Sequence, residues 1–429
     1  MDSRPLSDHT VVPDRASALG EVLRSASVRS FYQPIVDLVD GTVVGYEALA
    51  RGPIGSVLEL PDDLFAAATD AGRVGELDEL CMRAALEGSA ERMPDGLPLF
   101  VNVEPATLDS DLVRRTAPIP TAGGRTIVLE ITERAITRSP QALLSGVATA
   151  REHGWRIALD DVGVEAGSLA LLPIIRPDVV KLDMGLIRDE PDINLGRTMA
   201  AVMAYAERTG ATILAEGIET DDHLDRAVSL GATLGQGYRF GRPGELPSTL
   251  PTALPGGRPH RSHLRDFVAQ RPIALSPFDA VVAAGRPTRT ATKRVLLQIS
   301  HHIEEQAAVD PGSPLILSAF QDARHFTPAT ASRYARLVRN CSLVAALGIG
   351  MADGPTRGVR GARLLDGDPL TDEWSVVVLG SHYCGALLGK DLGGPLGSDA
   401  ERRFSYTVTH DRDLVELAAE SLLRRLISI

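Results

Sequence analysis

Carboxylates, amides and one lysine recur along the first half of the chain, each at the end of a short apolar run. They are Glu47, Asn102, Glu130, Asp160, Asp161, Lys181, Glu216 and Gln236. A single glutamate or aspartate in such a place is usually a helix cap or a solvated loop residue. Several carboxylates gathered at one place would instead repel one another unless cations lay among them. Carboxylate and amide oxygens suit hard cations, so the series predicts a site for Mg²⁺ or Mn²⁺.

The adjacent pair Asp160 and Asp161 suits a bridging role between two such ions. Two ions roughly 3.5–4 Å apart activate water and stabilise the leaving oxygen in phosphodiester hydrolysis. The pair therefore predicts hydrolysis of a phosphodiester at a two-metal site.

The apolar runs that carry these residues are typical of parallel strands. They span residues 31–36, 43–47, 99–103, 127–131, 157–161, 179–183 and 213–216, and a shorter run ends at Gln236. Helical stretches rich in alanine and leucine separate most of them, which indicates strands covered on both faces. About eight such strands predict a TIM-like (β/α)8 barrel, in which the carboxyl ends of the strands open on one face. The Asp40-Gly41 pair predicts a hairpin between the first two runs, so we expect the first strand to be antiparallel.

The length of 429 residues predicts more than one domain. Prolines and glycines cluster between residues 241 and 259, as in a linker. We divide the chain into an N-terminal segment at 1–24, a barrel at 25–245, a linker at 246–268 and a smaller α/β domain at 269–429. In the last of these the pattern predicts helices over 290–308, 327–338 and 413–427, and strands over 315–320, 343–349 and 374–379.

Composition argues against several classes of function. The net charge of −12 and the aromatic content of 4% disfavour a surface for nucleic acid. The first ten residues are polar and every apolar stretch is too short to cross a bilayer, so we expect a cytoplasmic protein with no membrane segment. The three cysteines have no metal-ligand spacing and fit buried thiols.

An ordered series of motifs resembles the EAL-domain cyclic di-GMP phosphodiesterases. The series comprises Tyr-Gln-Pro-Ile-Val at 32–36, Glu-Ala-Leu-Ala-Arg at 47–51, Val-Asn-Val at 101–103, Glu-Ile-Thr-Glu at 130–133, Ala-Leu-Asp-Asp at 158–161, Val-Lys-Leu-Asp at 180–183, Ala-Glu-Gly-Ile-Glu at 215–219 and Gly-Gln-Gly-Tyr at 235–238. The resemblance covers most of residues 25–245 and implies cyclic di-GMP as the ligand, two ions of Mg²⁺ or Mn²⁺, and a homodimer formed through the barrel.

The resemblance also implies a role for each site residue. The first ion would be held by Glu47, Asn102, Glu130 and Asp160, and the second by Asp160, Asp161 and Glu216. Lys181 would position the attacking water, with Glu216 and Glu47 as the other catalytic residues. Gln236 would support that arrangement, Arg51 would meet a phosphate because a guanidinium fork fits phosphate oxygens, and Gln33 would contact a guanine.

One loop departs from the family pattern. After the aspartate pair the family continues Phe-Gly-Thr-Gly-Tyr-Ser-Ser-Leu, whereas this chain has Val-Gly-Val-Glu-Ala-Gly-Ser-Leu at 162–169. In the family this loop couples the metal site to the dimer interface, and Glu133 is the residue that would help anchor it. Glu165 stands in place of a glycine and Val164 in place of a threonine, so the loop's conformation and hydrogen bonding must differ.

Three functions stay open at this point. The first is a phosphodiesterase that opens cyclic di-GMP to linear pGpG, which the intact metal set favours. The second is a non-catalytic receptor that binds cyclic di-GMP and signals to a protein partner, which the altered loop favours. The third is a scaffold with a relic site, although unpaired acidic groups would be costly to keep there.

The second half resembles the DICT sensory domain, roughly over residues 276–391. The supporting residues include Arg-His-Phe at 324–326, Trp374 and His-Tyr-Cys at 382–384. The resemblance implies a sensor whose ligand is unknown. For His325 and His382 an ordinary loop or core position is favoured over a role in ligand sensing.

Overall fold

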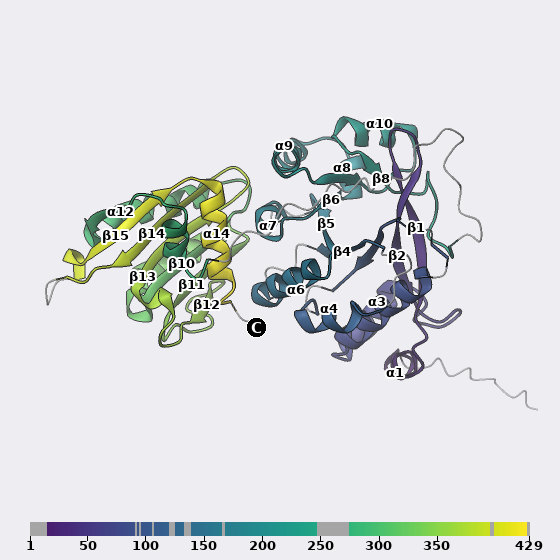
Figure 1. The fold of residues 1–429 in the computed structure, drawn as a ribbon, viewed down its shortest axis with the longest axis horizontal. Helices are drawn as coiled ribbons and strands as arrows, with labels where there is room; N and C mark the ends of the chain where they lie inside the picture. Colours follow the sequence, from purple (N-terminus) through teal and green to yellow (C-terminus); the bar gives the residue numbers. More distant parts are fainter. Residues whose placement is uncertain are drawn as a thin grey trace, which may run out of the picture.

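The chain folds into two bodies that lie side by side, a barrel and an open sheet covered by helices (Figure 1). The computed structural model describes residues 15–90, 92–93, 96–104, 107–119, 125–132, 139–164, 168–246, 274–394 and 399–426. Most of the expected linker at 246–268 falls outside these residues.

Eight strands close the barrel in the order of the sequence. They are β1 (Arg29–Asp37), β2 (Val43–Arg51), β3 (Leu99–Asn102), β4 (Ile127–Thr132), β5 (Arg156–Val162), β6 (Val179–Leu182), β7 (Thr212–Ala215) and β8 (Leu234–Gly235). Strand β1 is antiparallel to both of its neighbours, β2 and β8, and the other pairs are parallel. Both predictions, the barrel and its antiparallel first strand, are confirmed.

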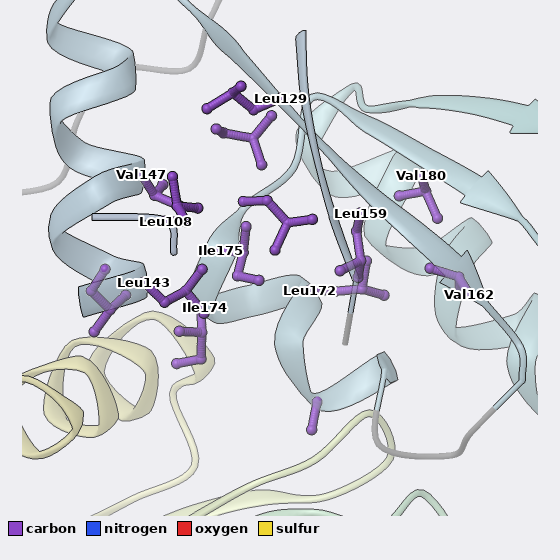
Figure 2. Close-up of a cluster of buried hydrophobic side chains, with 14 of the residues drawn as sticks. Leu108, Leu129, Leu143, Val147, Leu159, Val162, Leu172, Ile174, Ile175 and Val180 are labelled. Carbon is purple, nitrogen blue, oxygen red and sulfur yellow. The ribbon is translucent and has the colours of Figure 1, made fainter. Parts of the chain in front are cut away.

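The barrel strands are apolar on both faces, which is why they read as continuous apolar runs. One set of side chains fills the barrel interior and includes Ile35, Phe100, Val128 and Leu214. The alternate residues point outward against the helices. Figure 2 shows Leu129 and Leu159 on the side of the strands where α6 (Pro140–Glu152) and α7 (Ser168–Ile175) pack.

The remaining helices of this body surround the barrel. They are α1 (Arg15–Ser25), α2 (Pro61–Asp70), α3 (Val74–Ala90), α4 (Ser110–Thr116), α8 (Met184–Arg188), α9 (Ile193–Thr209) and α10 (Asp221–Ser229). Helix α1 packs on α2 and α3 through Leu19 and Val22. Side-chain caps begin several of these helices: Asp109, Asp192 and Thr220 each accept a hydrogen bond from a backbone amide of the first turn.

The second body is a seven-stranded sheet in the order β12-β11-β10-β13-β14-β15-β9. Its strands are β9 (Arg289–Thr292), β10 (Leu315–Asp322), β11 (Leu343–Ile349), β12 (Arg360–Arg363), β13 (Glu373–Leu379), β14 (Cys384–Asp391) and β15 (Arg403–Thr409), and its helices are α11 (Pro277–Ala283), α12 (Lys293–Val309), α13 (Pro328–Leu337) and α14 (Arg412–Leu423). The helix expected over 290–308 begins only at Lys293, because the preceding residues pair with β15 as an edge strand.

The two bodies meet along the last helix. Helix α14 packs against α7 of the barrel, as seen in the centre of Figure 1. Arg208 of α9 forms an ion pair with Glu416 of α14 at 3.4 Å, and the Gln141 amide donates to the Leu426 carbonyl at 3.4 Å. Within the residues that the structure describes, no helix is long and apolar enough to cross a membrane.

Candidate active site

The carboxyl ends of the barrel strands bring the predicted residues to one place. Each of β2 to β6 contributes a residue, respectively Glu47, Asn102, Glu130, Asp160 and Lys181, while Glu216 and Gln236 directly follow β7 and β8. Parallel register aligns the strand ends: Asn102 of β3 lies beside Glu130 of β4, and Thr132 lies beside Asp160. Residues far apart in the sequence are therefore neighbours on one face of the barrel.

A buried lysine occupies the centre of this face. The Lys181 ammonium lies 2.7 Å from carboxylate oxygens of Glu130 and of Glu216, 3.0 Å from Asp160 and 3.8 Å from Glu47. Its side chain is only 1% exposed. Burial by itself would lower the pKa of Lys181, but the four carboxylates raise it well above its ordinary value. The site thus holds a fixed positive charge inside a shell of acids.

Amide side chains hold Glu47 in place. Asn102 Nδ2 donates to one carboxylate oxygen at 2.8 Å, and Gln236 Nε2 donates to the other at 2.6 Å. Gln236 Nε2 also donates to Gln33 Oε1 at 3.0 Å, and Gln33 Nε2 donates in turn to the Gly241 carbonyl at 3.0 Å. Burial opposes ionisation of Glu47, but Lys181 and these hydrogen bonds outweigh it and lower its pKa.

Two other acids of the shell are harder to ionise. Burial raises the pKa of Glu216 to about 8 against the attraction of Lys181, and it raises the pKa of Glu130 well above its ordinary value. Both oxygens of Glu130 and Oδ1 of Asp160 are buried, and apart from the Lys181 ammonium they have no hydrogen-bond donor among the described residues. Buried acceptors with so few donors are uncommon in proteins. A set of oxygens of this kind suits a cation.

A local distortion allows both aspartates of the pair to serve the same face. Neighbouring residues of a regular strand point to opposite sides. Here Asp161 has a φ of 56°, and the β5–β6 register shifts between Leu159 and Val162. Aspartate tolerates the left-handed region better than most residues do. As a result, ligand oxygens of Asp160, Asp161 and Glu216 lie within 4.8 Å of one another, which is close enough to hold one ion.

A cavity of about 290 Å³ opens beside the carboxylates. Glu47, Asn102, Arg51 and Asp78 are among the residues that line it. The Arg51 guanidinium lies 5.3 Å from the centre of the Phe31 ring and donates to the Ala50 carbonyl at 2.7 Å. The Arg51 guanidinium and the oxygens of Glu47 and Asn102 therefore share one concave space, as a phosphorylated ligand would require.

The model of the EAL domain family matches residues 16–243, more than half of the chain. The chain belongs to the EAL-domain family. A second model, that of the sensory domain in diguanylate cyclases and two-component systems (DICT), matches residues 276–392. The sheet domain is thus a DICT domain, and both resemblances drawn from the motifs are confirmed.

Known relatives share the EAL domain. The chain is 30% identical over 239 residues to the probable cyclic di-GMP phosphodiesterase PdeG of Escherichia coli strain K12, over 52% of this chain and 46% of PdeG. It is 27% identical over 231 residues to the cyclic di-GMP phosphodiesterase RocR of Pseudomonas aeruginosa, over 52% of this chain and 58% of RocR. The chain spans about half the length of these curated relatives. A structure of Klebsiella pneumoniae BlrP1 with manganese and cyclic di-GMP is 28% identical, with a TM-score of 0.45 over 51% of this chain and 56% of BlrP1.

Asp78 lines the cavity of the EAL barrel, although no motif contains it. It lies on α3, is 2% exposed, and accepts hydrogen bonds from the Thr107 hydroxyl and, at 3.2 Å, from the Glu104 amide. Burial raises the pKa of its carboxyl to about 7. The sequence could have drawn attention to Asp78, because this acid falls among Leu77, Cys81 and other apolar residues on the buried side of a helix. An acid there needs a reason beyond packing.

The loop that departs from the EAL pattern is only partly described. Val164 is exposed, and its amide donates to the Asp161 carbonyl at 3.3 Å. Glu165 and the expected anchor Glu133 lie outside the described residues. Anchoring of the loop by Glu133 therefore stays a prediction.

Proposed function

We propose that this chain is a metal-dependent phosphodiesterase that opens cyclic di-GMP to linear pGpG. The observation that carries the proposal is the shell of acids around Lys181, in which three buried carboxylate oxygens have no hydrogen-bond donor among the described residues other than that one ammonium. The relatives PdeG and RocR, named as cyclic di-GMP phosphodiesterases, support the choice of substrate.

In this proposal the oxygen donors hold two divalent ions, Mg²⁺ or Mn²⁺. Glu47, Asn102, Glu130 and Asp160 would hold the first, and Asp160, Asp161 and Glu216 the second. When bound, such ions activate water and stabilise a leaving oxygen. Oxygen ligands of mixed carboxylate and amide type fit Mg²⁺ or Mn²⁺ better than a soft metal.

The other polar residues of the site then orient the substrate and the water. The Lys181 ammonium, held by Glu130 and Glu216 at 2.7 Å, would donate to the attacking water and fix its direction. Arg51 would pair with a phosphate from the cavity wall. Gln33 keeps one N–H beyond its contact with the Gly241 carbonyl, and that group would meet a guanine edge.

We further propose that the DICT domain regulates the barrel through α14 and α7. Helix α7 follows the aspartate pair after a short loop and packs on β5, the strand that carries that pair. Helix α14 of the DICT domain packs on α7 from the other side. A shift of α14 would thus move the element that supports Asp160 and Asp161. The homodimer through the barrel, which the EAL resemblance implied, stays a prediction.

A single assay tests the enzymatic proposal. Purified full-length protein is incubated with cyclic di-GMP and Mg²⁺ or Mn²⁺, and the product is resolved by liquid chromatography. We expect the wild type to form linear pGpG and to form no product in the presence of a chelator. The Asp160→Asn variant should form no product although its circular dichroism spectrum matches that of the wild type. If the protein binds cyclic di-GMP tightly but does not hydrolyse it with either ion, the enzymatic proposal is refuted and the receptor function is supported. If Asp160→Asn hydrolyses cyclic di-GMP at the wild-type rate, the assignment of Asp160 to the active site is refuted.

A further inference from the structure

The DICT domain contains a small pocket between its sheet and helices α12 and α13. Its volume is about 50 Å³, which corresponds to roughly three to five water-sized atoms. Apolar walls come from Phe320 of β10, Trp374 of β13, Phe404 of β15 and Leu297 of α12. The three aromatic rings are at most 8% exposed. We call this space the sensor pocket. It is separate from the site on the barrel.

Polar groups close the sensor pocket at two ends, and only one end has a replaceable partner. At the first, Arg333 pairs with Glu304, whose side chain is 3% exposed and also accepts from the Tyr334 hydroxyl at 3.2 Å. At the second, Lys293 pairs with Asp399. The Lys293 side chain is 14% exposed, but that of Asp399 is 56% exposed. Asp399 also pairs with Arg402 at 3.3 Å. An incoming anion that displaced the exposed Asp399 into water would take over both cations, whereas Glu304 is buried and cannot leave in this way.

The histidine at the second end faces positive donors on both sides. His325 Nδ1 lies 3.2 Å from the Lys293 ammonium, and His325 Nε2 lies 3.3 Å from the Arg402 guanidinium. A neutral imidazole has one acceptor nitrogen and one N–H. One of the two contacts therefore sets a donor against a donor. Burial, Lys293 and Arg402 together lower the pKa of His325, and Asp399 only partly offsets them. An anionic oxygen beside this ring would give every donor an acceptor.

Backbone strain places a further polar group in the wall of the pocket. Gln321 has a φ of 64° and lies where the β10–β11 register shifts. Its buried amide accepts from Arg402 at 3.4 Å and donates to Asp391 at 3.3 Å. Residues other than glycine seldom adopt this region of φ, and such strain gathers at functional positions. Gln321 thus contacts Arg402, which lies beside His325.

We propose that the sensor pocket binds a small organic carboxylate with a short apolar chain, about the size of propionate. The carboxylate would take the place of Asp399 on Lys293 and accept from His325. The alkyl chain would lie against Phe320, Trp374 and Leu297. This inference does not depend on hydrolysis at the barrel, since it is tested by binding alone.

Trp374 provides a direct readout. The chain has two tryptophans, so Trp155→Phe leaves Trp374 as the single fluorophore. Full-length protein in this background is titrated with sodium propionate at constant ionic strength. We expect saturable binding with a Kd on the order of 1 mM, given the few atoms of the ligand. Propionamide lacks the negative charge and tests whether binding requires it. Nitrate lacks the alkyl chain and tests whether binding requires that chain. Both should bind at least about tenfold more weakly.

Two variants should change propionate binding in opposite directions, so a loss of binding caused by misfolding can be recognised. Lys293→Met should weaken propionate binding at least about tenfold, because the ammonium is the main partner of the carboxylate. Asp399→Asn should strengthen binding a few-fold, because it removes the competing carboxylate. Lys390→Met, at an exposed lysine of the same domain, is the matched control and should change nothing. Absence of saturation in the parent protein would overturn the proposal. So would equal affinity for propionamide or nitrate, or weaker binding by Asp399→Asn.

Discussion

Replacement of Lys181 by methionine tests whether the acids of the site depend on its charge. The ammonium is 1% exposed and lies within 3.0 Å of Glu130, Glu216 and Asp160. Methionine keeps the length and the apolar stem but removes the charge. Breaking a buried ion pair by removal of one partner costs about 3–5 kcal/mol. For a domain of this size the loss corresponds to a melting temperature lower by roughly 6–20 °C.

Divalent ions should reverse much of this loss. In the variant the carboxylates have no internal counter-charge, so a bound cation compensates them directly. A ligand at 100 times its Kd stabilises the folded state by about 2.7 kcal/mol. We therefore expect Mn²⁺ to raise the melting temperature of Lys181→Met by more degrees than that of the wild type. Heating in chelator and in Mn²⁺, followed by circular dichroism, measures both effects.

The control for this experiment is Lys390→Met, which removes an exposed lysine from the DICT domain. It should melt as the wild type does in either buffer. The reasoning fails if Lys181→Met in chelator melts within about 2 °C of the wild type, since a loss of about 1 kcal/mol or less would mean a solvated lysine. It also fails if Mn²⁺ stabilises the two proteins equally.

Three further outcomes are expected. Arg208→Glu places a like charge beside the buried Glu416, so the free energy of unfolding measured in urea should fall by roughly 1–3 kcal/mol. Adding Glu416→Arg should restore most of the loss. An unchanged urea midpoint for Arg208→Glu would contradict the contact between the two domains. Burial raises the pKa of Glu373 from 4.5 to about 7, so the folded state holds a proton that the unfolded chain has released. The free energy of unfolding should then fall by up to roughly 3 kcal/mol as pH rises through that window, and Glu373→Gln should remove this slope; equal slopes would argue against it. Ca²⁺ in place of Mg²⁺ should slow hydrolysis at least about tenfold, because its larger radius loosens the coordination, and equal rates would argue against a strict metal geometry.

Local patterns in the sequence were enough to predict the barrel and which polar residues lie at the carboxyl ends of its strands. Continuous apolar runs that end in Glu130, Asp160 or Lys181 place each residue at a strand end, because burial on both faces and the following helix are properties of a short segment. The Asp40-Gly41 turn likewise predicted a hairpin between the first two strands, and β1 does pair with β2 in the antiparallel sense, with Gln33 opposite Glu47.

The DICT domain shows where the local signal ends. Strands β12, β14 and β15 were not predicted, and β9 includes residues that were expected to begin a helix. The sheet order places β9 against β15, more than a hundred residues later, so its state is decided by a distant partner rather than by its own propensity.

Tertiary structure alone decided how the site residues meet. No spacing in the sequence places the Lys181 ammonium among four carboxylates, turns Asp161 to the face of Asp160 through a φ of 56°, or brings Asp78 into the cavity. The packing of α14 on α7 is equally invisible in the sequence, because the apolar residues of a helix indicate that it is buried but not which element covers it. Periodicity reports which side of an element is buried. The distances between side chains from different elements follow from the packing of the whole chain, because each depends on registers and contacts formed by residues far away in the sequence.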